Sequence, residues 1–341
     1  MNWLALMAFL VSLIAAQATA AQTADSGNSA VVVMYHRFGE SQYPTTSIRI
    51  EQFEQHIALL EAEGARVLPL RQVVDRLRAG ESLPDRAVAI TVDDAYRSVM
   101  THAWPRLKAA GLPLTMFVAT DGIDAGGSDL LTWDEIRQLA AEGVEIGHHG
   151  AAHAHLTGFT PSDVVRDLDR ASARFEAELG RVPDLFAYPY GEVSLAVREA
   201  VRAYGFRAAF GQQSGPVHAG SDFFNLPRFA LNERFGDEDR FRLAIDTLPI
   251  PARDVTPEEL LLDDAHNPPR FGFTLARRIG NLDLLKCYAS HVGEVTVVRL
   301  GEDRVEVRFD EPFPQGRGRI NCTIPAPGGG WRWIGTQFTI D

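Results

Sequence analysis

Residues 87–96 read AVAITVDDAY, a mostly apolar run of six residues that leads directly into two aspartates. Similar short apolar runs recur along the chain, and segments of helical periodicity separate them. Apolar strands that alternate with helices are typical of parallel βαβ units, in which both faces of the sheet are covered. The runs are AVVVMY (30–35), ARVLPL (65–70), AVAITV (87–92), LTMFVA (114–119), VEIG (144–147), LFAY (185–188) and RAAF (207–210).

The segments between these runs have the spacing of amphipathic helices. Val164, Leu168 and Phe175 share one helix face, and Thr132 is the expected N-cap of another helix. About seven βα units predict an α/β fold with a distorted (β/α) barrel of about seven parallel strands over residues 30–250. Periodicity alone leaves an open parallel sheet as the alternative.

The pattern changes after about residue 250. The segment PIPARDVTPEE (249–259) is a proline-punctuated linker candidate, and strict alternation of apolar and polar residues begins after residue 291. This alternation is typical of antiparallel strands, so we expect a small β domain over residues 255–341. The alternating runs are EVTVVRL (294–300), DRVEVRF (303–309), RINCTI (319–324) and WRWIGTQFTI (331–340).

The N-terminus has the pattern of a targeting segment. Residues 3–16 form one apolar run, and a small-x-small site ends at Ala20. We therefore predict a signal peptide over residues 1–20, followed by a flexible leader over residues 21–29. The alternative is an uncleaved anchor, but the run is shorter than the ~20 residues that a spanning helix needs. The mature chain is expected to be periplasmic or secreted, without stable membrane insertion.

Composition excludes several classes of protein. The chain has 341 residues, with 45 acidic and 33 basic side chains and a net charge of −12. This balance disfavours nucleic-acid partners and polybasic membrane binding. Two cysteines exclude a zinc site of four thiolates. Cys287 and Cys322 are candidates for one disulfide in an oxidising compartment, although the sequence does not show that they lie close together.

Polar residues follow four of the expected strands at their carboxyl ends. They are His36 after the first run, Asp93-Asp94 after the third, His148-His149 after the fifth, and Pro189-Tyr190-Gly191 after the sixth. In parallel α/β folds the carboxyl ends of the strands lie along one rim, where active sites form. The sequence therefore predicts a single site at this rim.

Two of these groups have the chemistry of a metal site. His149 and His153 are four residues apart, so on a helical turn both imidazoles point the same way. With Asp94 they would form a three-ligand site with an open position for a borderline metal ion. The alternative is a surface histidine cluster. Asp93 and Asp94 point to opposite faces of a strand, so they can take different roles. The alternative for this pair is capping of the next helix.

Together these motifs resemble polysaccharide deacetylases of the NodB-homology type, carbohydrate esterase family four, over about residues 30–235. The matching pieces are TVDDAY (91–96), EIGHHGAAH (145–153) with Leu156, and FAYPYG (186–191). The resemblance implies a distorted (β/α)-type barrel that removes N-acetyl groups from glycans.

The resemblance also implies a role for each matching residue. Asp94, His149 and His153 would bind a divalent metal ion, usually zinc. Asp93 would be the general base, and the backbone N–H of Tyr190 would help to hold the oxyanion. General chemistry agrees, since a metal ion with three protein ligands lowers the pKa of a bound water towards ~7 and polarises a carbonyl.

The chain departs from the common family pattern at several positions. Ala187 stands where an arginine usually orients the catalytic aspartate, and Gly150 stands where serine or threonine is usual. We expect Arg228, near a later strand end, to supply the missing guanidinium; the alternative is a solvated surface charge. The family's late Leu-x-x-His motif is not recognisable. His36 is therefore the candidate general acid, as in permuted relatives, and the alternative is a histidine that shapes the rim.

These expectations define a predicted function. The chain is expected to be a metal-dependent hydrolase that removes N-acetyl groups from an extracellular or periplasmic glycan of the N-acetylglucosamine type. One alternative is an O-acetyl esterase on the same scaffold, because metal, base and acid serve esters equally well. Another is a non-catalytic glycan-binding protein, which the arginine missing at Ala187 suggests.

Overall fold

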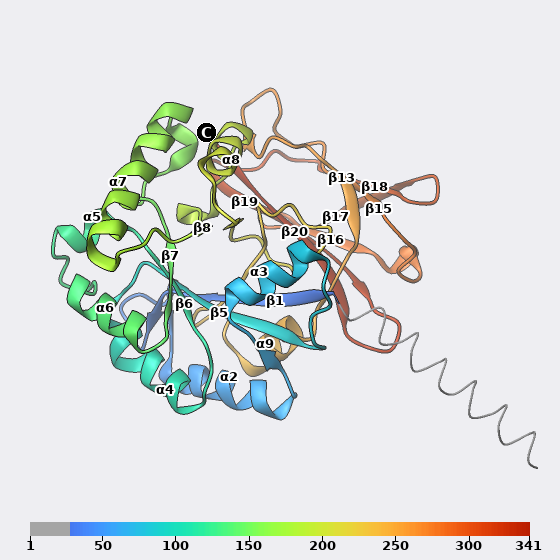
Figure 1. The fold of residues 1–341 in the computed structure, drawn as a ribbon. Helices are drawn as coiled ribbons and strands as arrows, with labels where there is room; N and C mark the ends of the chain where they lie inside the picture. Colours follow the sequence, from blue (N-terminus) through green and yellow to red (C-terminus); the bar gives the residue numbers. More distant parts are fainter. Residues whose placement is uncertain (1–27) are drawn as a thin grey trace, which may run out of the picture.

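The computed structural model describes residues 28–341, which form two large β-sheets with helices around the first (Figure 1). The predicted signal peptide, residues 1–20, lies outside the described residues, as do residues 21–27 of the predicted leader. Strand β1 begins at Ser29, so the last residue of that predicted leader is already part of the fold. In the described part of the chain, no helix is long and apolar enough to cross a lipid bilayer.

The first sheet is the mostly parallel sheet that the sequence predicts. Its strands run in the order β10-β1-β5-β6-β7-β8-β9, with β11 beside β1 and β4 beside β5. All of these neighbours are parallel except β10, which runs antiparallel to β1. The strands are β1 (Ser29–Tyr35), β4 (Arg66–Val67), β5 (Ala87–Asp93), β6 (Thr115–Val118), β7 (Glu145–His148), β8 (Leu185–Ala187), β9 (Ala208–Phe210), β10 (Val217–His218) and β11 (Phe229–Ala230).

Each of the seven predicted apolar runs overlaps a strand of this sheet, although residues 65–70 supply only the two residues of β4. The two edges of the sheet meet over a short segment. Leu226 forms a parallel bridge with Phe210 of β9, and β11 then pairs with β1. The sheet therefore curls into a distorted, incomplete barrel, as predicted, rather than an open sheet.

Helices cover the outer face of the barrel (Figure 1). Every residue of β5 is buried, as expected for a strand covered on both faces. The predicted cap at Thr132 is confirmed, because its side chain accepts a hydrogen bond from the N–H of Glu135 at the start of α6. The helices are α2 (Ile50–Ala62), α3 (Leu70–Ala79), α4 (Trp104–Ala109), α5 (Thr120–Asp124), α6 (Trp133–Ala141), α7 (Pro161–Leu179), α8 (Leu195–Tyr204) and α9 (Glu238–Ile245).

The second sheet is mainly antiparallel and contains all four predicted alternating runs, as β17, β18, β19 and β20. Its order is β12-β20-β19-β16-β17-β18-β15-β13, with β14 beside β20. The strands are β12 (Leu248–Pro249), β13 (Ala252–Thr256), β14 (Leu261–Leu262), β15 (Gly272–Leu275), β16 (Lys286–Ala289), β17 (Gly293–Leu300), β18 (Arg304–Arg308), β19 (Gly316–Pro325) and β20 (Trp331–Ile340).

Two features refine the sequence expectations for this part of the chain. Cys287 of β16 and Cys322 of β19 lie directly opposite each other and are joined by a disulfide, which confirms the candidate pair. The second sheet takes its first strand, β12, from within the predicted barrel range of residues 30–250. The division of the chain at residues 250–255 stays a prediction.

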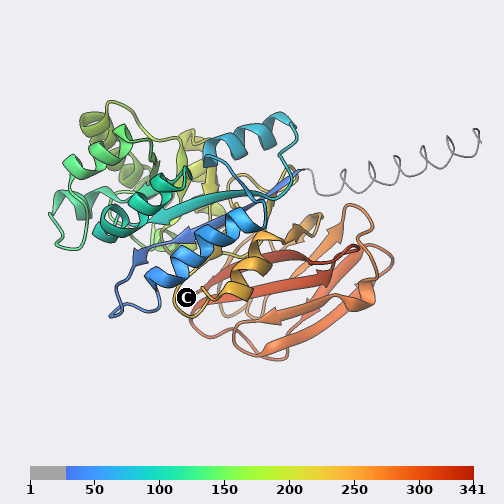
Figure 2. The same cartoon turned by 90° about the horizontal axis from the view of Figure 1, so that it is seen from below.

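The second sheet packs against one side of the barrel (Figure 2). A single buried apolar cluster joins Leu168 of α7 and Val201 of α8 to Phe338 of β20. Strand β20 comes very close to the barrel at Gly335, where a Cβ atom would lie 2.1 Å from the carbonyl oxygen of Ser214. The two sheets therefore share one core, and β20 is in direct contact with the loops of the barrel.

Candidate active site

The structure brings the three predicted metal ligands together at the carboxyl-terminal rim of the barrel. Asp94 follows β5, His149 follows β7, and His153 lies in the loop after it. One ligand atom from each lies within 4.8 Å of the other two. Oδ1 of Asp94 is 3.1 Å from Nε2 of His153 and 3.5 Å from Nε2 of His149. The alternative of a scattered surface histidine cluster is wrong for His149, whose side chain is 1% exposed.

The chemistry of this donor set fits a divalent cation. Nδ1 of His149 donates a hydrogen bond to the carbonyl oxygen of Ala187 at 2.6 Å, so Nε2 is the nitrogen that faces Asp94. Oδ1 of Asp94 is buried and has no well-aligned hydrogen-bond donor among the described residues. Burial lowers the pKa of His149, but the carboxylates of Asp94 and Asp93 raise it by more. The site therefore favours positive charge between these atoms, which a bound metal ion would supply.

Asp93 lies beside this cluster and is paired with Arg228. The guanidinium donates to both carboxylate oxygens, at 2.7 and 2.8 Å, and both side chains are fully buried. It also donates to the carbonyl oxygen of Gly211 at 3.0 Å and to the hydroxyl of Thr91 at 3.3 Å. The alternative of a solvated surface charge at Arg228 is wrong. The structure places its guanidinium on Asp93, as the missing arginine at Ala187 predicts.

The pairing sets the charge of the candidate base. Burial raises the pKa of Asp93, but Arg228 and His149 lower it by more, so the net pKa lies below its ordinary value. Asp93 is therefore ionised at neutral pH and is able to accept a proton. Its role as general base stays a prediction.

His36 follows β1 on the same rim and is half-buried. Burial lowers the pKa of His36 below its ordinary value, and the carboxylates of Asp94 and Asp93 offset only part of this effect. His36 thus lies within electrostatic reach of both aspartates. Its role as that acid stays a prediction.

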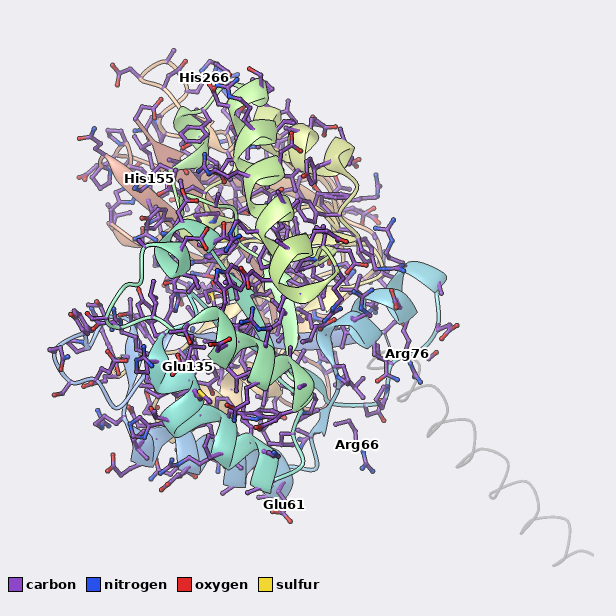
Figure 3. The ribbon with its side chains drawn as sticks, turned by 60° about the vertical axis from the view of Figure 1, so that its left-hand side comes forward. Glu61, Arg66, Arg76, Glu135, His155 and His266 are labelled. Atoms are coloured by element: carbon purple, nitrogen blue, oxygen red, sulfur yellow. A yellow bond between two sulfur atoms is a disulfide. The ribbon has the colours of Figure 1, made fainter. Side chains whose placement is uncertain are left out.

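Tyr190 lies in the short turn after β8 and has a left-handed backbone, with φ +60° and ψ 0°. Its ring packs edge-on against His153, with centroids 4.6 Å apart, and stacks on His155 at 4.1 Å. Figure 3 shows His155 on the side of the molecule where the second sheet meets the barrel. His155 in turn hydrogen-bonds Glu192 at 2.7 Å. The use of the Tyr190 N–H as an oxyanion donor stays a prediction.

Backbone strain is concentrated around these residues. Among the described non-glycine residues, six have positive φ. Four of them belong to the site: Asp94, Ala95, His153 and Tyr190. Such conformations cost about 1–3 kcal/mol each and persist where the surrounding structure holds them. The rim is therefore built around a few strained turns that need support from elsewhere in the fold.

Asp167 of α7 supplies such support and was missed by sequence reasoning. Its carboxylate accepts hydrogen bonds from the N–H groups of Ala151 (2.8 Å) and Ala152 (3.0 Å), inside the loop that carries His149 and His153. A Cβ atom at Gly150 would lie 2.7 Å from this carboxylate. The glycine therefore makes room for an aspartate that holds the loop. The sequence feature that could have indicated this role is the position of Asp167, a charged residue, on the buried face of an amphipathic helix.

Gln337 and Arg317 reach the site from the second sheet, and no sequence signal connected them with it. Gln337 donates to the carbonyl oxygens of Tyr190 (3.0 Å) and Gly191 (2.9 Å). Arg317 donates to the same Tyr190 carbonyl oxygen at 3.3 Å. The site therefore includes residues from both sheets.

Comparison with known proteins agrees with this arrangement. Residues 80–209 match the family model described as polysaccharide deacetylase. The chain is 21% identical over 232 residues to a poly-beta-1,6-N-acetyl-D-glucosamine N-deacetylase of Staphylococcus aureus, covering 60% of this chain and 80% of that protein. The structure resembles that of IcaB from Ammonifex degensii, with a TM-score of 0.58 and 25% identity over 65% of this chain and 98% of that one.

A second solved structure supports the fold. It is the Streptococcus pyogenes deacetylase PplD in complex with acetate, with a TM-score of 0.59 and 19% identity over 64% of this chain and 99% of that one. The family match over residues 80–209 and these relatives confirm the resemblance to polysaccharide deacetylases that the sequence motifs carry.

Proposed function

We propose that this chain is a metal-dependent deacetylase that removes N-acetyl groups from a polymer of the N-acetylglucosamine type, in the periplasm or outside the cell, with zinc as the metal. The observation that carries the proposal is the cluster of Asp94, His149 and His153 beside an ionised Asp93. The substrate class is supported by the name of the Staphylococcus aureus relative. The location rests on the predicted signal peptide over residues 1–20.

Each residue of the site has a separate role in amide hydrolysis. A divalent ion held by Asp94, His149 and His153 would lower the pKa of a water molecule and polarise the acetyl carbonyl. Asp93 accepts the proton of the attacking water, and Arg228 keeps its carboxylate ionised and in a fixed orientation. The carboxylate of Asp93 is thus already oriented and ionised before substrate binds.

Two further groups complete the reaction. The backbone N–H of Tyr190 donates to the oxygen on which negative charge develops. His36 transfers a proton to the leaving nitrogen, because an amide anion is a very poor leaving group. Both groups lie on the rim that carries the metal ligands, and His153 contacts the Tyr190 ring directly.

The test is acetate release from defined glycans by the purified, zinc-supplemented protein. We expect release from β-1,6-linked N-acetylglucosamine oligomers and little from acetylated xylan. Asp93→Asn should keep the metal and lose most activity, because an amide cannot accept the proton. Preferential release from acetylated xylan would instead identify the O-acetyl esterase. Loss of metal in Asp93→Asn would mean that the roles of the two aspartates are exchanged.

The observation that favoured a non-catalytic glycan-binding protein has another explanation. It rested on the arginine missing at Ala187, and Arg228 provides a guanidinium on Asp93 from a later strand. Binding of the oligomers without acetate release, in protein that carries zinc, would restore that alternative.

A further inference from the structure

The second sheet makes a direct polar contact with the turn that carries the predicted oxyanion donor. The side-chain amide of Gln337, on β20, donates to the carbonyl oxygens of two successive residues of the turn, Tyr190 at 3.0 Å and Gly191 at 2.9 Å. Gln337 is 4% exposed, so these bonds are shielded from competing water. One side chain from the second sheet therefore fixes two peptide groups of the barrel.

The orientation of the Gln337 amide is itself determined by a neighbour. Nε of Arg319, on β19, donates to Oε1 of Gln337 at 3.0 Å. The NH₂ group must then face the turn, because the amide has one acceptor end and one donor end. Arg317, two residues earlier on β19, adds its bond to the Tyr190 carbonyl oxygen at 3.3 Å. The second sheet thus presents an ordered set of donors to this turn.

The turn needs an external support because its backbone is strained. Tyr190 has a positive φ of +60°, which is costly for a residue with a Cβ atom, and the next residue, Gly191, has a φ of +69°, which glycine adopts freely. A Cβ atom at Gly191 would lie 2.6 Å from the side chain of Gln212, so the turn is also tightly enclosed. The N–H and the carbonyl of Tyr190 belong to the two peptide groups on either side of its Cα. The φ and ψ of Tyr190 set the orientation of one of these groups relative to the other. A fixed direction for that carbonyl therefore restricts the direction of the N–H.

We propose that Gln337 is a positioning residue for deacetylation: it holds the Tyr190 turn so that the backbone N–H of Tyr190 points at the developing oxyanion. The proposal rests on the function proposed above and gives the second sheet a part in the active site. Gln337 acts through Tyr190 and does not touch the reacting atoms. Because the oxyanion forms only in the transition state, loss of this support lowers kcat and leaves KM nearly unchanged.

The test compares Gln337→Glu with Gln337→Met and a matched control. The glutamate has the same size but places an acceptor opposite two carbonyl oxygens, and the methionine removes the donors without repulsion. We expect kcat to fall about 10- to 100-fold, more in the glutamate variant, since small misplacements of a catalytic donor have effects of this order. KM should stay within about twofold and zinc content should stay stoichiometric.

Thr339→Val is the control, since Thr339 is also buried and lies two positions further along β20, on the same strand face. It should keep wild-type kcat. Unchanged kcat in both Gln337 variants would overturn the proposal. So would a loss of activity that only follows a loss of zinc or of folded protein, because that would be a general structural effect.

Hydrogen exchange separates this proposal from the proposed function. In the zinc-loaded protein, a peptide that covers residues 188–193 should exchange faster in Gln337→Glu than in the wild type or in Thr339→Val. If the wild type releases no acetate from any glycan, the proposed function fails, and this exchange measurement still decides whether Gln337 holds the turn. Equal exchange in all three proteins would show that it does not.

Discussion

Replacing Arg228 by methionine removes the guanidinium from a fully buried ion pair and leaves a side chain of similar length to fill the space. The two hydrogen bonds to Asp93, at 2.7 and 2.8 Å, are lost, and the carboxylate stays in a site with no exposure to solvent. Breaking a buried pair in this way costs about 3–5 kcal/mol of folding free energy. For a domain of this size, that corresponds to a fall in Tm on the order of 10 °C.

The loss should depend on pH, with a sign that follows from the pKa of Asp93. In the wild type the folded-state pKa lies below the ordinary 3.8, so the carboxylate stabilises the fold above pH 3.8 and this contribution is lost as the pH falls through the lower folded-state value. Without Arg228, burial raises the pKa instead. Protonation then removes the buried charge as the pH falls, so the deficit of the variant is largest at neutral pH and shrinks in acid.

The assay is thermal unfolding of the metal-free wild type, Arg228→Met, Asp93→Asn and the double variant, at pH 7.5 and pH 5. The double variant should unfold at a higher temperature than Arg228→Met alone, because a neutral amide carries no charge to compensate. The reasoning is refuted if Arg228→Met lowers Tm by less than about 3 °C at pH 7.5, since a buried unpaired charge cannot cost so little. An equal Tm deficit at both pH values would refute the electrostatic part of the argument.

Three further predictions concern the other parts of the site. His153→Ala should abolish stoichiometric zinc, measured by metal analysis, together with acetate release; full activity without metal would contradict it. His36→Ala should reduce N-deacetylation far more than hydrolysis of an activated aryl acetate, because only the amide needs a protonated leaving group, and equal losses would argue against a general acid. Asp167→Ala should weaken zinc affinity about 10- to 100-fold in a chelator competition, because the loop that carries two ligands loses its support. Unchanged zinc affinity would remove Asp167 from this role.

The parts of the site that the sequence predicted are those that lie close to a strand end. Asp93 is the last residue of β5, Asp94 directly follows it, and His149 directly follows β7, so the topology of a parallel sheet was enough to bring them together. Arg228 is far from Asp93 in the sequence. It was predicted because the family that the motifs resemble usually has an arginine where Ala187 stands, and Arg228 lies near a later strand end.

The parts that were missed depend on contacts between distant segments. The carbonyl of Tyr190 meets Gln337 across 147 residues, and the alternation of β20 shows only which face of the strand a glutamine occupies. The route of β20 past the barrel depends on close packing at Gly335, which has no pattern of its own in the sequence. Asp167 lies between the predicted and the missed residues. A charged residue on a buried helix face indicates that a polar partner exists, but the sequence does not show which residue it is.

The central claim is that one metal ion, bound by Asp94, His149 and His153, is required for deacetylation. The most direct measurement is a zinc titration of chelator-stripped protein, with acetate release from N-acetylglucosamine oligomers as the readout. We predict no activity in the stripped protein, a linear rise as zinc is added, and a break at about one equivalent per chain. Full acetate release by the stripped protein, or a break that is unchanged in His149→Ala, would contradict the claim.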